Sequence, residues 1–270
     1  FPELVMDANN TKDGKIYAVT EKFGYNTISY DKTKVDPKDM EDLSIIWSDK
    51  YKGRIAIYDY YLPVIGMAAM AIGKKTSELT EADLPALKDV LLKMKANAKA
   101  VTDVAASQTA LATGEADVLV GGGEWVTAGI AKDNPDLDFS IPKEGAVLWS
   151  QSLAMFKDSK NKVAAKQFVA FMLDEANLTP YVEGSLGRWF PVTKNAQQSK
   201  FWKEDPHRLV VYNQFMNGTT PFEFTKNYKF TVLNNENVWA KAMNRILNEK
   251  VPVDKAVDEM IARIKTVAAQ

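Results

Sequence analysis

The 270-residue chain alternates between strand-like and helix-like runs, and this alternation limits its fold more than any other feature. Runs rich in β-forming residues at 53–61, 98–104 and 117–120 are separated by a helical pattern at 82–96 and a shorter one at 107–116. Strands that alternate with helices are typical of domains with largely parallel sheets covered by helices. The sequence therefore predicts an α/β fold.

Three helical segments place their apolar residues at the spacing of one helix face. These positions are Leu84, Leu87, Leu91 and Met94 in residues 82–96, Ala164, Phe168, Phe171 and Met172 in residues 161–175, and Val257, Met260, Ile261 and Ile264 in residues 253–269. Thr80, three residues before Asp83, predicts a cap at the start of the first helix. Residues 15–31 predict two short strands around Gly24, and residues 146–156 predict a long strand.

Composition and charge exclude several classes of protein. The net charge of −1 gives no basic excess for nucleic acid. The chain has no cysteine and one histidine, His207, which excludes disulfides, thiolate metal sites and histidine-cluster metal sites. A Ser–His–Asp triad would need His207, whose context, "KEDPHRL", is polar and loop-like. The longest apolar run, residues 63–73, is about half of the ~20 residues that span a bilayer. The sequence therefore predicts a protein that is not an enzyme and has no metal, no cofactor and no nucleic-acid partner.

The stretch "VGGGEW", residues 120–125, joins a predicted strand to a predicted helix. Such a turn presents backbone N–H groups at a helix N-terminus, where a bound carboxylate or phosphate is favoured. Ligand sites of α/β sheets also lie at the carboxyl ends of strands. The alternative is that the glycines only make a tight turn against a neighbouring element. The local pattern leaves both interpretations open.

Aromatic and polar side chains mark three further stretches. "YDYYLP", residues 58–63, ends a strand, and we expect Tyr58 to pack inside while Tyr60 or Tyr61 lines a pocket. Trp149 and Gln151 share one face of a strand, as a ligand wall or with the tryptophan in the core. Arg188, in "GSLGRWFPV", is either a carboxylate clamp or part of a structural salt bridge.

Taken together, these stretches resemble periplasmic solute-binding proteins of bacterial ABC importers, in the branch that holds the spermidine/putrescine binders. The resemblance rests on segments that match in order along nearly the whole chain: "GKIYAVTEKFGYNTISYD", "DLSIIWSDKYKGRIAIYD", "ALATGEADVLVGG", "IPKEGAVLWSQSLAMFKDSKNKVAAKQFVAFML" and "GRWFPVTKNA". The family implies a two-lobed α/β fold of type II, with the ligand held between lobes that are joined by crossing strands.

By this resemblance, residues 28–146 with about 201–270 form the second lobe, and residues 1–27 with about 147–200 form the remainder of the first. The N-terminal part of the first lobe, with the signal peptide, is expected to be absent from this chain. The alternatives are a fragment, a processed piece, or one half of a split or engineered protein whose N-terminal segment is a partner on another chain. The resemblance also implies a periplasmic location, a small-molecule ligand that the closing lobes enclose, and an inner-membrane permease as partner.

Departures from the family pattern bear on the ligand. Tyr60 and Pro63 stand where the polyamine binders carry acids, and Gln151 stands where an acid follows the cleft tryptophan. Gly122 replaces another cleft tryptophan, and Arg188 replaces a tyrosine. Fewer acids and an added arginine disfavour a diamine, because unpaired buried charges are costly.

These departures predict a small zwitterion, such as γ-aminobutyrate, as the ligand. Arg188 and the N–H groups of residues 121–124 are expected to bind its carboxylate, Glu124 its ammonium, and the rings of Tyr60 and Trp149 its body. The predicted ligand-binding residues are Tyr60, Tyr61, Gly122, Gly123, Glu124, Trp149, Gln151 and Arg188. The alternatives are a polyamine, an opine or a sugar as ligand, and, as other classes, an enzyme or the effector domain of a regulator.

Overall fold

The fold was examined in a computed structural model of the chain. The structure describes residues 10–59, 61–75, 78–131, 133–174, 176–178, 181, 190–192, 209, 222–223, 230–247 and 249–269.

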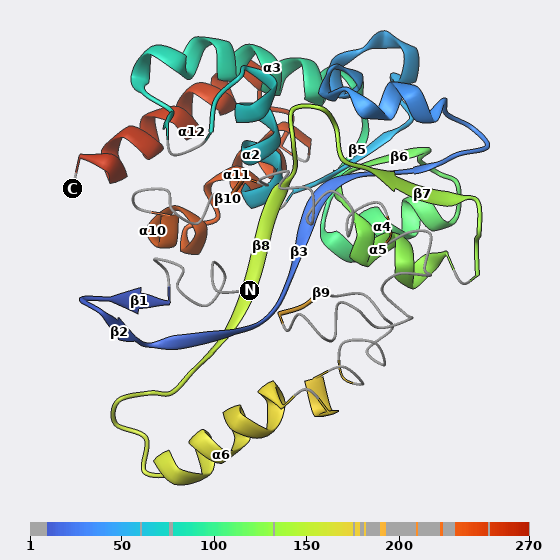
Figure 1. The fold of residues 1–270 in the computed structure, drawn as a ribbon. Coiled ribbons are helices and arrows are strands. Elements are labelled where there is room, and N and C mark those ends of the chain that lie inside the picture. The colour runs from blue at the N-terminus through green and yellow to red at the C-terminus, as the bar shows by residue number, and fades with distance from the viewer. Residues whose placement is uncertain are drawn as a thin grey trace.

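An eight-stranded mixed sheet runs through the molecule (Figure 1). The main order is β10 (Phe222–Glu223), β8 (Val147–Ala154), β3 (Ala18–Asp31), β6 (Val118–Gly122), β4 (Ile55–Tyr58) and β5 (Ala98–Thr102). β7 (Leu137–Ser140) and β9 (Phe190–Pro191) also pair with β3, and β1 (Thr11–Lys12) forms a separate hairpin with β2 (Lys15–Ile16). β4 is parallel to β5 and β6, whereas β3 is antiparallel to all its partners. The α/β class is confirmed, but the sheet is mixed rather than largely parallel.

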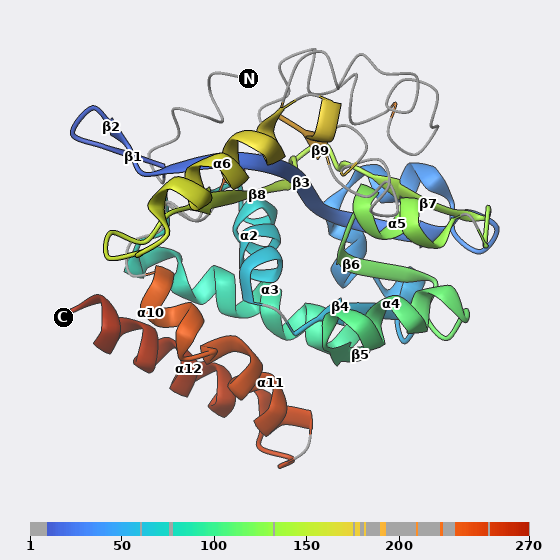
Figure 2. The same cartoon turned by 90° about the horizontal axis from the view of Figure 1, so that it is seen from below.

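Helices lie on both sides of this sheet (Figure 2). They are α2 (Tyr61–Ala71), α3 (Leu84–Asn97), α4 (Val104–Ala112), α5 (Glu124–Ile130), α6 (Lys162–Leu173), α10 (Phe230–Asn235), α11 (Val238–Leu247) and α12 (Val253–Ala268). Short 3-10 helices are η1 (Pro37–Glu41), η2 (Leu43–Trp47), η3 (Asp49–Tyr51) and η5 (Glu81–Asp83). Within the described segments, no helix has the length and apolar character needed to cross a membrane.

The predicted apolar faces of α3 and α12, apart from Leu84, lie in the larger of two cores. Leu87, Leu91 and Met94 of α3 are buried, and so are Val257 and Met260 of α12. The predicted cap is also present, because the backbone N–H and the hydroxyl of Thr80 both donate to Asp83 Oδ2 at 2.8 Å. Local pattern and tertiary packing agree in these two helices.

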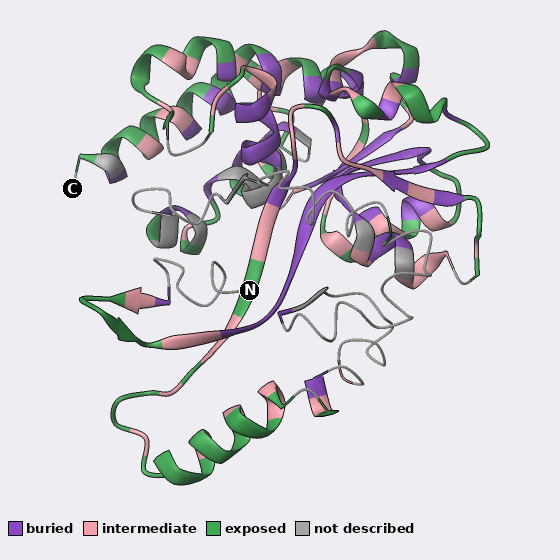
Figure 3. Cartoon of the chain, viewed as in Figure 1, coloured by how far each residue is buried: buried purple, intermediate pink, exposed green. Residues whose placement is uncertain are grey.

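Helix α6 behaves differently. It forms as predicted, but none of its residues is buried, and Phe168 and Phe171 keep 56% and 58% of their surface exposed (Figure 3). Spacing alone predicted an apolar face and gave no information on what covers it.

Strand β3 corrects one expectation. Residues 18–31 form one strand of 14 residues, not two short strands around Gly24. The ladder to β8 continues through Gly24, which lies opposite Trp149, and the neighbouring β-forming residues outweigh the low strand preference of glycine. At Asn26 and Thr27 the pairing changes from β8 to β6 and β7. The division into lobes at residues 28 and 146 stays a prediction.

Candidate functional site

Predicted site residues lie at one edge of the sheet, directly after two neighbouring strands. Because β4 and β6 are parallel neighbours, their carboxyl ends meet at the same edge. α2 begins there with Tyr61, and α5 begins there with Glu124 directly after Gly122 and Gly123. The side chains of Tyr61 and Glu124, and the whole of Tyr60 and Arg188, lie outside what the structure describes.

The glycines are required by packing within the protein. Gly121 has a φ of +94°, and a Cβ there would lie 2.8 Å from Cδ2 of Tyr58. Gly123 has a φ of +150°, and its Cβ would lie 2.3 Å from the carbonyl oxygen of Tyr25. The close neighbours of this backbone are therefore β4 and β3, as a tight turn requires. Ligand binding at these glycines stays a prediction. Tyr58 is 1% exposed, as the sequence predicted for a packing residue.

The backbone N–H of Gly123, which the sequence predicted to be free, already has an acceptor within the protein. The N–H of Gly123 donates to Ser29 Oγ at 2.8 Å, and this hydroxyl lies 3.1 Å from Thr127 Oγ1. Both Ser29 and Thr127 are fully buried, so the bond is shielded from water. The prediction of a bare N–H group is wrong at Gly123, because β3 places a hydroxyl where the anion was expected.

Strands β3 and β8 form a ladder beside this edge. Asn26 Nδ2 donates to the carbonyl oxygen of Gly121 at 2.8 Å and so connects β3 to the end of β6. Along the ladder, Gly24 lies opposite Trp149 and Lys22 lies opposite Gln151. Directly opposite residues share a face of the sheet, and side chains two apart on one strand do too. Lys22, Trp149 and Gln151 are therefore neighbours on one face.

Helix α2 packs against the first residue of β8. β8 is antiparallel to β3, and β3 to β6, so β8 runs parallel to β6 and β4. α2 follows β4 and folds back along the sheet, where Gly66 packs against Val147: a Cβ on Gly66 would lie 2.6 Å from Val147 Cγ2. Trp149 lies two residues further along β8, on the same face as Val147.

Two indole N–H groups near this edge are buried without an acceptor. They belong to Trp149 in β8 and Trp125 in α5, and neither finds a hydrogen-bond partner in the described part of the protein. A buried donor without an acceptor costs about 1–3 kcal/mol. Trp149 itself is half-buried, and Gln151 is exposed. Among the described residues, none therefore supplies an acceptor to the indole N–H of Trp149.

Two charged residues were missed by the sequence reasoning. Glu21 and Lys22 lie at an irregularity of the β3–β8 ladder and are buried, with Lys22 Nζ 3.3 Å from Glu21 Oε1. Lys22 Nζ also donates to Tyr181 Oη at 2.8 Å. Adjacent opposite charges inside a predicted strand were a usable signal, because charged residues are rarely buried unless paired.

Asp59 lies at the same edge, directly after β4. Burial, and then the carboxylate of Asp103, raise its pKa above the ordinary aspartate value. A pKa raised by folding means that the folded state binds the proton more tightly, so ionisation of Asp59 opposes folding at neutral pH.

We expect Asp59→Asn to raise the melting temperature at pH 7, and the gain to shrink as the pH falls through the pKa of folded Asp59. Thermal melts between pH 4 and pH 7 check this; an unchanged or lower melting temperature at pH 7 contradicts it.

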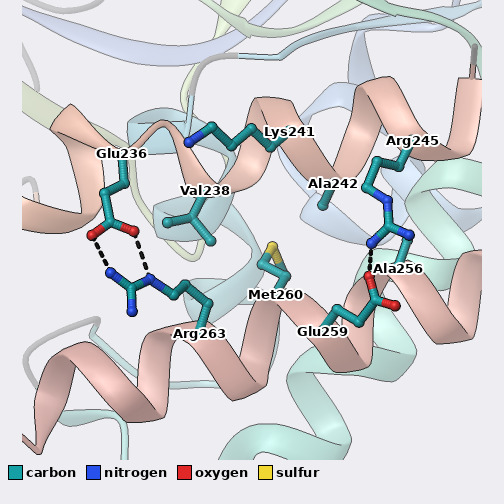
Figure 4. Close-up of a pocket in the computed structure, with 9 residues that line it drawn as sticks. All are labelled: Glu236, Val238, Lys241, Ala242, Arg245, Ala256, Glu259, Met260 and Arg263. Carbon is teal, nitrogen blue, oxygen red and sulfur yellow. Dashed lines mark hydrogen bonds and ion pairs between the residues drawn. The ribbon is translucent and has the colours of Figure 1, made fainter.

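Two pockets are lined entirely by described residues. One of about 310 Å³ lies between α11 and α12, with Val238, Ala242, Ala256 and Met260 among its lining (Figure 4). Arg263 pairs with Glu236 at one end, and Arg245 with Glu259 at the other. A second, of about 470 Å³, joins Asp59 to α11. No predicted ligand-binding residue lines either pocket, and no group of three metal-ligating side chains occurs among the residues described.

Comparisons with known proteins place these features in context. A profile described as "Bacterial extracellular solute-binding protein" matches residues 1–210. The spermidine/putrescine-binding periplasmic protein of Escherichia coli is 27% identical over 169 residues, which are 62% of this chain and 46% of the relative. The putrescine/cadaverine-binding protein of Pseudomonas aeruginosa is 27% identical over 179 residues, covering 60% of this chain and 47% of the relative. The chain thus spans about half the length of these relatives.

A solved structure shows the same fold. The putative spermidine/putrescine ABC transporter from Listeria monocytogenes aligns with a TM-score of 0.72 and 22% identity, covering 88% of this chain and 71% of the other. The mixed α/β architecture is therefore that of two-lobed binding proteins, as the resemblance predicted.

Proposed function

Because the chain belongs to the bacterial extracellular solute-binding protein family, we propose that it captures a small ligand for an ABC importer. The family consists of binding proteins rather than enzymes, and the E. coli relative is named as periplasmic. In this proposal the ligand lies between two lobes that close by a hinge motion, and the closed form docks on an inner-membrane permease. The carboxyl ends of β4 and β6 and the Trp149 face of β8 form its binding surface.

The ligand is a small amino-acid-like zwitterion in this proposal, and the observation that carries it is the buried N–H of Trp149, which has no acceptor in the part of the chain that the structure describes. A protonated diamine carries only donors, so it cannot accept a hydrogen bond from an indole. A carboxylate accepts one, and a hydrogen bond to a charged group contributes about 1.5–3 kcal/mol. The neutral Gln151 beside Trp149 also offers no counter-charge to a second ammonium.

A polyamine is the second candidate, and the relatives favour it. Both curated relatives described above are named as putrescine binders. Their similarity covers about 60% of this chain, so the putrescine in their names is the second ligand that we consider for this chain. γ-Aminobutyrate and putrescine are closely matched probes: both have four carbons with an ammonium at one end, and the other end is a carboxylate in γ-aminobutyrate and a second ammonium in putrescine.

Trp149→Phe separates the two candidates, because it keeps an aromatic ring and removes only the N–H. With γ-aminobutyrate as the probe, we expect the dissociation constant to rise about tenfold or more. Isothermal titration calorimetry with γ-aminobutyrate, putrescine and glucose measures this. Trp47→Phe in η2, a half-buried tryptophan away from β8, is the matched control and is expected to change no affinity.

Two outcomes of this calorimetry would contradict the proposal. Tight binding of putrescine alone, unaffected by Trp149→Phe, would make this chain a polyamine binder. Binding of glucose in preference to both amines would assign a sugar, since hydroxyl groups also accept hydrogen bonds.

A further inference from the structure

We propose that the pocket between the end of β4 and α11 is a second ligand site, which takes a small zwitterion separately from the Trp149 surface. The ammonium of this ligand lies at Asp59 and its carboxylate at Lys241. The volume of the pocket, about 470 Å³, is within the range of small-molecule sites. Its lining is Asp59 from the sheet side and, from α11 and the residues next to it, Asn237, Lys241, Asn244, Arg245 and Glu249.

The pocket is accessible to a solute. Asn237, Lys241 and Asn244 are exposed, and Asp59 is half-buried. Both charged ends of the site can therefore be reached without any rearrangement of the core.

The strand order separates this pocket from Trp149. β3 and β6 lie between β8, which carries Trp149, and β4, which Asp59 directly follows. Three strand spacings of about 4.8 Å make roughly 14 Å. A four-carbon ligand is shorter than this, because each of its bonds adds no more than about 1.5 Å. One such ligand cannot occupy both places, so the pocket is a separate site.

The two unpaired charges of the pocket have opposite signs. Arg245 is already neutralised, because it pairs with Glu249 at 3.5 Å and also with Glu259. Neither Lys241 nor Asp59 has an ion pair in the described part of the chain, and Figure 4 shows Lys241 without an interaction to the other residues drawn. The pocket is therefore complementary to one carboxylate and one ammonium group.

The ammonium end is strengthened by a second acid. Asp103 directly follows β5, the parallel neighbour of β4, and the backbone N–H of Asp59 donates to the carbonyl oxygen of Thr102 at 2.8 Å. Burial and the Asp103 carboxylate raise the pKa of Asp59, and no cation of the described chain lies close enough to lower it. An ammonium group placed at this end would offset both effects, because an opposite charge favours the ionised carboxylate.

The carboxylate end lies at the start of a helix. Asn237 directly precedes α11, and the carbonyl oxygen of Asn237 accepts the backbone N–H of Lys241 at 3.1 Å. Side chains lean toward the N-terminus of their helix, so the amine of Lys241 is directed to the first turn. The positive end of the helix dipole also favours an anion there. Both features favour the carboxylate of the ligand at this end.

Isothermal titration calorimetry of the whole chain with γ-aminobutyrate tests the second site, and we expect a two-site isotherm. Asp59→Asn and Lys241→Gln should each weaken one of the two sites at least tenfold and leave the other unchanged. Trp149→Phe should weaken only the other site. In the Trp149→Phe chain, putrescine and butyrate should bind the pocket at least tenfold more weakly than γ-aminobutyrate. Putrescine places a second ammonium beside Lys241, and butyrate leaves Asp59 without a partner.

Two variants with the same changes of charge are the matched controls. Lys255→Gln in α12 and Asp89→Asn in α3 alter exposed residues that line neither pocket, and neither variant should change an affinity. Asp59→Asn carries its own control for folding, because we expect it to raise the melting temperature at pH 7. Weaker binding together with higher stability cannot result from loss of the fold.

The outcomes separate this inference from the proposed function. A one-site isotherm that Trp149→Phe weakens, and that Asp59→Asn and Lys241→Gln leave unchanged, overturns this inference and leaves the proposed function standing. A one-site isotherm that only the two pocket variants weaken supports this inference and overturns the assignment of the ligand to Trp149. Absence of binding by γ-aminobutyrate, putrescine and butyrate overturns both.

Discussion

Replacing Gly123 with alanine is expected to lower the free energy of unfolding by about 4 kcal/mol, from two effects of comparable size. Gly123 combines a φ of +150° with a ψ of −166°, a backbone region that is nearly restricted to glycine. A Cβ at this position would also lie 2.3 Å from the carbonyl oxygen of Tyr25, which belongs to a central strand and cannot move away easily. Such a loss is a large part of the roughly 5–15 kcal/mol that stabilise a typical domain.

Gly53→Ala separates the two effects. Gly53 has a φ of +76°, but no atom lies within 4 Å of the position that its Cβ would take. We expect this variant to lose only about 1 kcal/mol, from the backbone conformation alone. Urea unfolding followed by circular dichroism measures both variants, and equal losses would show that Tyr25 does not oppose a side chain at Gly123.

Tyr58→Ala is expected to destabilise the fold by about 4 kcal/mol, as large-to-small substitutions of buried aromatic residues do. Tyr58 is 1% exposed at the end of β4, and its ring packs beneath Gly121. Without the ring, the glycine turn and the start of α2 would lose the packing that supports them. We therefore expect ligand affinity to fall together with stability.

Tyr58→Phe is the matched control for this cavity. It removes only the hydroxyl, which receives a hydrogen bond of 3.3 Å from Gln108 Nε2, and we expect a loss below about 1 kcal/mol. Unfolding curves of the two variants give the comparison. A phenylalanine variant as unstable as the alanine variant would mean that the hydroxyl, and not the ring, supports the turn.

Local patterns predicted those features of the fold that depend on neighbours in sequence. The periodic apolar residues of α3 and α12 predicted helices and their buried faces, and Thr80 with Asp83 predicted a cap. Tyr58 was expected inside because an aromatic residue with high strand preference packs well in a buried strand, and it is buried. The same spacing in α6 predicted a helix but could not show that Phe168 and Phe171 remain exposed. Periodicity reports on a helix itself and carries no information on a covering element.

Contacts distant in sequence produced the errors and the omissions. The prediction of a free N–H at Gly123 failed because Ser29, 94 positions away, places a hydroxyl 2.8 Å from it. The predicted break at Gly24 failed because β8 continues the ladder through that residue. Lys22 was overlooked because its relation to Trp149 appears only in the register of two strands that are more than a hundred residues apart.

By itself, the sequence determined the α/β class, the main helices, the packing role of Tyr58 and, through ordered family segments, membership of the solute-binding proteins. These depend on short-range periodicity and on residue order, which a linear chain displays directly. Only the tertiary structure decided what lies against the glycines and which charges stand beside Trp149. Those depend on strand register, where a shift of one residue moves every side chain to the opposite face of the sheet, and register is fixed only when the whole sheet is packed.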